Sequence, residues 1–176
     1  MSNIKRIAVA AATVAVVMHG PIRAQSPPAG WQHASNGPGR FTVLVPSDLK
    51  ASPPTTDAQG VTTYTFVASQ PGKAYVVAYA NGSKADPQQE MNDARDALLK
   101  GISASLVSEH RFKSVQPVGE VTATEFTCRS ESQGTECKCR TFWYKSTLYM
   151  LGVLYRKGVG SALDTDKFLD SFRITS

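Results

Sequence analysis

The feature that most constrains this chain is a run of aromatic and aliphatic residues at positions 140–157, RTFWYKSTLYMLGVLYRK. Such residues favour strands, and the polar step at Lys145, Ser146 and Thr147 predicts a β-hairpin. Alternate residues of its second half are apolar on both faces: Leu148, Met150 and Leu154 on one, and Tyr149, Leu151, Val153 and Tyr155 on the other. A strand of this kind belongs in the middle of a sheet that is covered on both sides.

The N-terminus has the three parts of a secretory signal peptide. Lys5 and Arg6 precede an uncharged apolar stretch over residues 7–18, and Ala24 is the small residue after which we expect cleavage. The apolar stretch is shorter than the roughly 20 residues that a membrane-spanning helix needs. We therefore expect residues 1–24 to be a signal peptide, and the mature protein to be periplasmic or secreted, with no membrane span after cleavage.

Charge argues against nucleic acid as a partner. The formal net charge of the whole chain is +5, and removal of residues 1–24 takes away Lys5, Arg6 and Arg23 and lowers it to +2. The remaining acidic and basic residues are interspersed rather than gathered in a basic patch, which a nucleic-acid-binding protein would need.

The rest of the chain predicts one domain. Residues 25–38 are rich in proline and glycine and predict a flexible lead-in, in which Trp31 anchors the chain to the core. Residues 39–176 predict a single domain, with further strands at 39–46, 61–67, 73–81, 106–115 and 121–129. Asp86 and Pro87 predict the start of an amphipathic helix. A short terminal helix is predicted with a buried stripe of Phe168, Leu169 and Phe172.

No catalytic signature is present. His33 and His110 lie far in sequence from any plausible nucleophile, and the sequence contains no Gly-x-Ser-x-Gly nucleophile elbow. The glutamates at 120, 125, 131 and 136 are expected to be solubilising charges on hairpin edges. We therefore expect no enzyme activity, no cofactor and no metal.

The three cysteines are the unusual group. A two-residue turn at Gln133 and Gly134 would place Cys128 opposite Cys139, at a separation that a disulfide accepts, and would leave Cys137 as a free thiol. The alternative is that Cys137-x-Cys139 binds a thiophilic metal such as copper or zinc, with His110 or another thiol, or acts in thiol exchange. Zinc sites normally bring two ligand pairs, which favours the disulfide.

Several segments together resemble a known family. They are residues 39–46, 74–80, Glu125 with Phe126, Leu148 with Tyr149, and 168–174. The pattern resembles the PsbP-like superfamily, which includes the extrinsic photosystem II subunit, a Ran-binding factor and bacterial envelope lipoproteins. The resemblance implies an α+β fold, with an antiparallel sheet of about six to seven strands sandwiched between helices, and it carries no catalytic residue across.

Two functions follow as hypotheses. The first is an exported, non-catalytic domain that binds or assembles with an unknown protein or small ligand in the envelope or medium, as the resemblance suggests. The second is a small metal- or thiol-handling envelope protein that uses the Cys-x-Cys strand.

Overall fold

The structure is a computed structural model that describes residues 30–176 except 59, 82–85 and 161. The expected signal peptide, residues 1–24, lies outside the described residues. The elements in chain order are β1 (Gln32–Asn36), β2 (Phe41–Val45), β3 (Lys50–Ala51), β4 (Thr55–Thr56), β5 (Thr62–Gln70), β6 (Lys73–Asn81), α1 (Pro87–Gly101), β7 (Ser105–Gln116), β8 (Gly119–Ser130), β9 (Thr135–Tyr144), β10 (Thr147–Arg156), α2 (Ala162–Ser171) and β11 (Arg173–Ile174).

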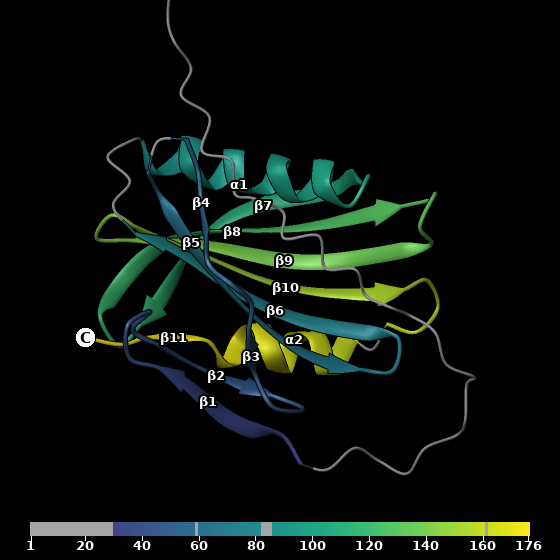
Figure 1. Ribbon diagram of the computed structural model, residues 1–176, viewed down its shortest axis with the longest axis horizontal. Coiled ribbons are helices and arrows are strands. Elements are labelled where there is room, and N and C mark those ends of the chain that lie inside the picture. Colours follow the sequence, from purple (N-terminus) through teal and green to yellow (C-terminus); the bar gives the residue numbers. More distant parts are fainter. Residues whose placement is uncertain (1–29, 59, 82–85, 161) are drawn as a thin grey trace, which may run out of the picture.

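The main sheet is antiparallel and eight-stranded, with the order β3-β5-β6-β10-β9-β8-β7 and β4 paired beside β3 on β5. Strands β5 and β6 form one hairpin, and β7 to β10 form a meander whose last strand returns to pair with β6. The aromatic run at 140–157 is therefore the β9–β10 hairpin, and β10 lies in the middle of the sheet, as the sequence predicted. Figure 1 shows α1 along the top of the view and α2 in its lower half, with β8, β9 and β10 between them.

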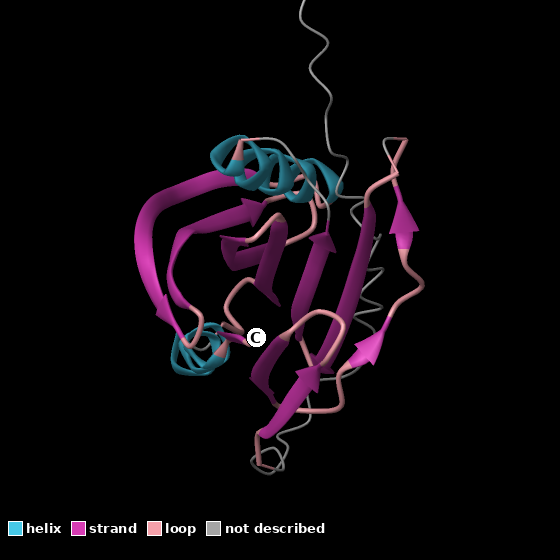
Figure 2. Cartoon of the chain, turned by 90° about the vertical axis from the view of Figure 1, so that its left-hand side faces the viewer, coloured by secondary structure: helices cyan, strands magenta, loops and turns pink. Residues whose placement is uncertain are grey.

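Both faces of β10 are buried, each against a different helix. On one face Leu148 and Met150 pack with Met91 and Ala94 of α1. On the other face Tyr149, Leu151 and Val153 belong to the larger core, which also contains the stripe that the sequence predicted on the terminal segment: Phe168, Leu169 and Phe172. In Figure 2 the strands curve between the same two helices. The sheet thus separates two apolar layers.

A second, three-stranded sheet shares the larger core with α2. Its order is β1-β2-β11, and Phe41, Val43 and Val45 of β2 are buried with Ile174 of β11. The α+β antiparallel class is confirmed, but α2 is only part of the layer on this face, and the main sheet has eight strands rather than six to seven.

The lead-in predicted over residues 25–38 was wrong for Gln32–Asn36, which form β1. This strand pairs with all five residues of β2, from Gln32 opposite Val45 to Asn36 opposite Phe41. Trp31, just before it, meets Tyr75 edge-to-face with ring centroids 5.6 Å apart. The strand was missed because none of its residues is fully buried, so that it shows no apolar alternation, and because it gains its pairing from a segment beyond the turn.

Helix α1 begins as predicted. The carboxylate of Asp86 accepts hydrogen bonds from the N–H groups of Gln88 and Gln89, and Pro87 occupies the first position, where no N–H is needed. The helix ends at Gly101, and Leu106 lies in the next element, β7. No helix within the described residues is long and apolar enough to cross a membrane.

Removal of the Phe172 ring tests the larger core. Its ring centroid lies 5.2 Å from that of Phe142, 5.6 Å from that of Tyr149 and 5.8 Å from that of Phe41. Because these neighbours come from three different strands, Phe172→Ala should lower the free energy of unfolding by about 3–5 kcal/mol in urea denaturation. Leu163, which is 80% exposed on α2, is the matched control. Leu163→Ala should change stability by less than about 0.5 kcal/mol, and equal losses at both sites would contradict this packing.

Candidate functional site

The cysteines do not pair as predicted. The disulfide joins Cys128 of β8 to Cys137 of β9, whose Cα atoms are 5.0 Å apart, and Cys139 is the free thiol. The prediction of a Cys128–Cys139 bridge with Cys137 free was therefore wrong. The prediction that a cross-strand disulfide exists is kept, and such a bond is typical of an oxidising compartment.

The length of the β8–β9 turn explains the correction. Ser130 pairs with Thr135, so the turn has four residues, 131–134, rather than two. A two-residue turn of the hairpin type needs a positive φ at both central residues, which Gln133 adopts poorly. In the structure only Gly134 of this turn has a positive φ, of 59°. The longer turn moves the partner of Cys128 by two residues, from Cys139 to Cys137 on the same face.

The Cys139 thiol is sealed within the protein. It is completely buried, and burial raises the pKa of the thiol well above its ordinary range, which keeps it protonated and unreactive. Its Sγ lies 3.7 Å from that of Cys137 and 2.9 Å from where a Cβ on Gly152 would stand. Phe126 and Leu154 complete the apolar cluster around the three sulfurs.

His110 cannot join these cysteines around a metal. It lies opposite Glu125 on β8, and Glu125 is an odd number of residues from Cys128, so the two point to opposite faces of the sheet. Among the described residues no group of three or more His, Cys, Asp or Glu side chains could hold a metal ion. His33 is exposed on β1.

Glu125 is not the solubilising charge that its sequence context suggested. Its side chain is 12% exposed and forms ion pairs with Arg140 at 2.6 Å and Lys138 at 3.2 Å. These bases in turn hold α2, since Arg140 pairs with Asp170 and Lys138 with Asp166. Burial lowers the pKa of Arg140, but its hydrogen bonds to the two carboxylates more than offset this and raise it. The network docks the helix onto the sheet.

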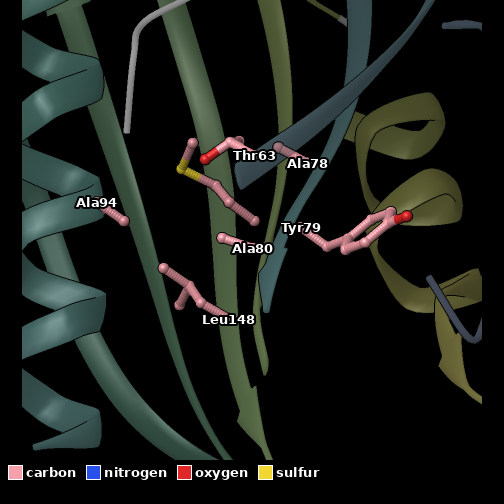
Figure 3. Close-up of a pocket in the computed structure, with 7 residues that line it drawn as sticks. Thr63, Ala78, Tyr79, Ala80, Ala94 and Leu148 are labelled. Atoms are coloured by element: carbon pink, nitrogen blue, oxygen red, sulfur yellow. The ribbon is translucent and has the colours of Figure 1, made fainter. Parts of the chain in front are cut away.

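A hollow lies between α1 and the strands β5, β6 and β10. It measures about 200 Å³, part of which is open solvent, and it is lined by Thr63, Ala78, Tyr79, Ala80, Ala94, Leu148 and Met150. Figure 3 shows that Tyr79 points away toward the other face, so that Thr63 alone supplies a polar side chain. Ligand sites are usually larger and combine apolar walls with several convergent polar groups, so this hollow is a poor ligand site.

A row of three tyrosines lies at one end of the main sheet, on the face of α2. Tyr64, Tyr79 and Tyr149 stand directly opposite one another on β5, β6 and β10. The first two rings stack with centroids 4.9 Å apart, and the third lies 6.5 Å beyond. Tyr64 is 36% exposed, whereas the other two are buried. The row therefore has one ring that a partner can reach.

Two basic residues flank this row, each in a turn. Lys145, in the β9–β10 turn, holds its Nζ 5.2 Å from the ring centroid of Tyr144. Arg40, in the β1–β2 turn, is exposed. The turn lies against the row, since a Cβ on Gly39, just before Arg40, would stand 2.5 Å from the ring of Tyr79. Burial raises the pKa of the Tyr149 phenol, and a hydrogen bond with Thr147 and the charge of Arg40 oppose that rise. We call this group the tyrosine end: Arg40, Tyr64, Tyr79, Tyr144, Lys145 and Tyr149.

Sequence reasoning missed the tyrosine end because its residues come from four strands and two turns. Both turns lie at the same end of the molecule, at the left in Figure 1 beside the C-terminus. The available signal was tyrosine on neighbouring predicted strands, with basic residues at the turns beside them. Only the register of β6 against β10 brings these residues together.

Comparison with known proteins shows the fold. No family model and no curated protein matches the sequence. The solution structure of cyanobacterial PsbP (CyanoP) from Synechocystis sp. PCC 6803 matches with a TM-score of 0.57 and 10% identity, over 88% of this chain and 98% of that one. This chain has a PsbP-like fold. A crystal structure from Bacteroides thetaiotaomicron VPI-5482 matches with a TM-score of 0.39 and 15% identity, over 78% of this chain and 46% of that one.

The PsbP-like sheet contains the disulfide, and its connectivity can be tested directly. Peptide mapping without reduction should recover a Cys128–Cys137 cross-link, and Cys139 should react with an alkylating reagent only after denaturation. Loss of the bond in a Cys128→Ala, Cys137→Ala variant should lower the free energy of unfolding by about 2–3 kcal/mol, because it closes a short loop. A cross-linked peptide that contains Cys139, or alkylation of Cys139 in the native protein, would contradict the assignment.

Proposed function

We propose that this protein is an exported, non-catalytic domain that binds or assembles with another component of the envelope or medium, and that the tyrosine end is its binding surface. The observation that carries the proposal is the exposed ring of Tyr64, backed by the buried ring of Tyr79 and flanked by Arg40 and Lys145. Tyrosine and arginine are the residue types that dominate the energetics of protein interfaces.

The scaffold behind this surface supports recognition. Tyr79 and Tyr149 lie in the two central strands and pack against the core residues Phe41, Phe66 and Phe172. Their rings are therefore held in place before any partner arrives, and a preorganised surface loses less conformational entropy on binding.

A binding function also fits the ionisable groups better than catalysis does. The carboxylates and bases that are partly buried, such as Glu125, Lys138 and Arg140, form ion pairs that attach α2. The Cys-x-Cys segment supports thiol or metal chemistry poorly, since Cys137 is in the disulfide and Cys139 is buried beside it.

Export is the part of the proposal that rests on two separate observations. The N-terminal 24 residues have the composition of a secretory signal peptide, and the Cys128–Cys137 bond is of a kind that persists in oxidising compartments. Together they support a periplasmic or secreted location. We also propose that the main sheet is sandwiched between helices, and that this sandwich is the scaffold that presents the tyrosine end.

Site-specific photo-cross-linking tests the binding surface. A photoreactive phenylalanine in place of Tyr64, in the full chain expressed in an exporting bacterium, should yield a discrete cross-linked species. The matched control carries the same group at Lys100, which is exposed near the end of α1 on the opposite face of the sheet. Cross-linking at both positions alike, or at Lys100 alone, would show that the tyrosine end is not the binding surface.

A further inference from the structure

The charge of the tyrosine end is not neutralised within the described part of the chain. Neither Arg40 nor Lys145 has a carboxylate partner among the described residues. The bases that do form ion pairs in the described part of the chain are Lys73, Arg95, Lys113, Arg129, Lys138, Arg140 and Lys157. Both side chains of the tyrosine end, those of Arg40 and Lys145, are exposed, and among the three rings of the row that of Tyr64 is exposed as well.

The backbone at these two positions does not explain why they are basic. Arg40 has a φ of 50°, Lys145 of 45° and Ser146 of 61°, in the left-handed region that favours glycine and asparagine. A two-residue hairpin turn with both φ values positive is most often Asn-Gly. Basic residues here cost backbone strain, and such strain gathers at functional sites when the surroundings hold it in place.

The surroundings of Arg40 do hold it in place. Its N–H donates to the carbonyl oxygen of Gly37 at 3.1 Å, and its own carbonyl oxygen accepts from the N–H of Thr175 at 2.8 Å. Gly39 before it lies so close to Tyr79 that an added Cβ would stand 2.5 Å from the ring. The β1–β2 turn is thus held against the ring of Tyr79, and this contact positions Arg40 at the same end of the sheet.

We infer that the tyrosine end binds an acidic segment of a partner protein. Carboxylates of the segment contact Arg40 and Lys145, and an apolar side chain next to them packs on the exposed ring of Tyr64. Arginine suits this role because its planar fork can donate two hydrogen bonds to one carboxylate. The inference rests on the proposed function and adds the chemistry of the partner.

Binding of a synthetic peptide measures this directly. The probe is a fluorescein-labelled peptide with four glutamates around one phenylalanine, and its control has glutamine at all four positions. Fluorescence anisotropy against the full chain should show tighter binding of the glutamate peptide, weakened by added salt. In an Arg40→Asn, Lys145→Asn variant the affinity should fall about tenfold or more. Asparagine tolerates a positive φ better than arginine or lysine, so the thermal midpoint of the variant should not fall.

A matched variant separates this site from net charge. Lys100→Gln removes one exposed positive charge on the other face of the sheet and should leave the affinity within about twofold of the original. Equal binding of the two peptides, full affinity in the Arg40→Asn, Lys145→Asn variant, or an equal loss in Lys100→Gln would each overturn the inference. So would displacement of the peptide by vesicles of anionic lipid as readily as by unlabelled peptide.

Different results would contradict the proposed binding surface and the inference of an acidic partner segment. A Tyr64 cross-link to a partner segment without acidic residues would overturn the inference and leave the binding surface standing. Loss of the cross-link itself, with the Lys100 control equally silent, would remove the support for the binding surface and for the inference together.

Discussion

The rest of the structure depends on the burial of β10 from both sides. A strand whose successive residues all face apolar layers cannot lie at an edge, so β6 and β9 must pair with it on either side. Its alternate residues then determine what covers each face. Leu148 and Met150 require α1, while Tyr149, Leu151 and Val153 require α2 and the small sheet.

The sequence predicted this centre because the evidence for it is local. Residues 148–155 show two apolar faces, and the turn at Lys145 and Ser146 joins the strands where the polar step occurs. The disulfide needed a further fact, the length of the turn between β8 and β9. The expected two-residue turn at Gln133 and Gly134 pairs Cys128 with Cys139, whereas the observed four-residue turn pairs it with Cys137.

Segments whose structure depends on partners distant in sequence were not predicted. Strand β1 reads as a loop by composition, and its five pairs with β2 form only once the 37–40 turn reverses the chain. Glu125 reads as a surface charge, and only the docking of α2 turns it into the centre of an ion-pair network. The tyrosine end is the extreme case, since four strands and two turns contribute to it and the pairing of β6 with β5 and β10 brings its row together.

Native-state hydrogen exchange tests the central claim most directly, because it reports the stability of each strand separately. The amides of β10 that bond to β6 and β9 should exchange only through global unfolding and be the slowest in the protein. The amides of the exposed strand β7, at the edge of the main sheet, should exchange faster. If β10 exchanged as fast as β7, burial of β10 on both faces could not be what holds this fold together.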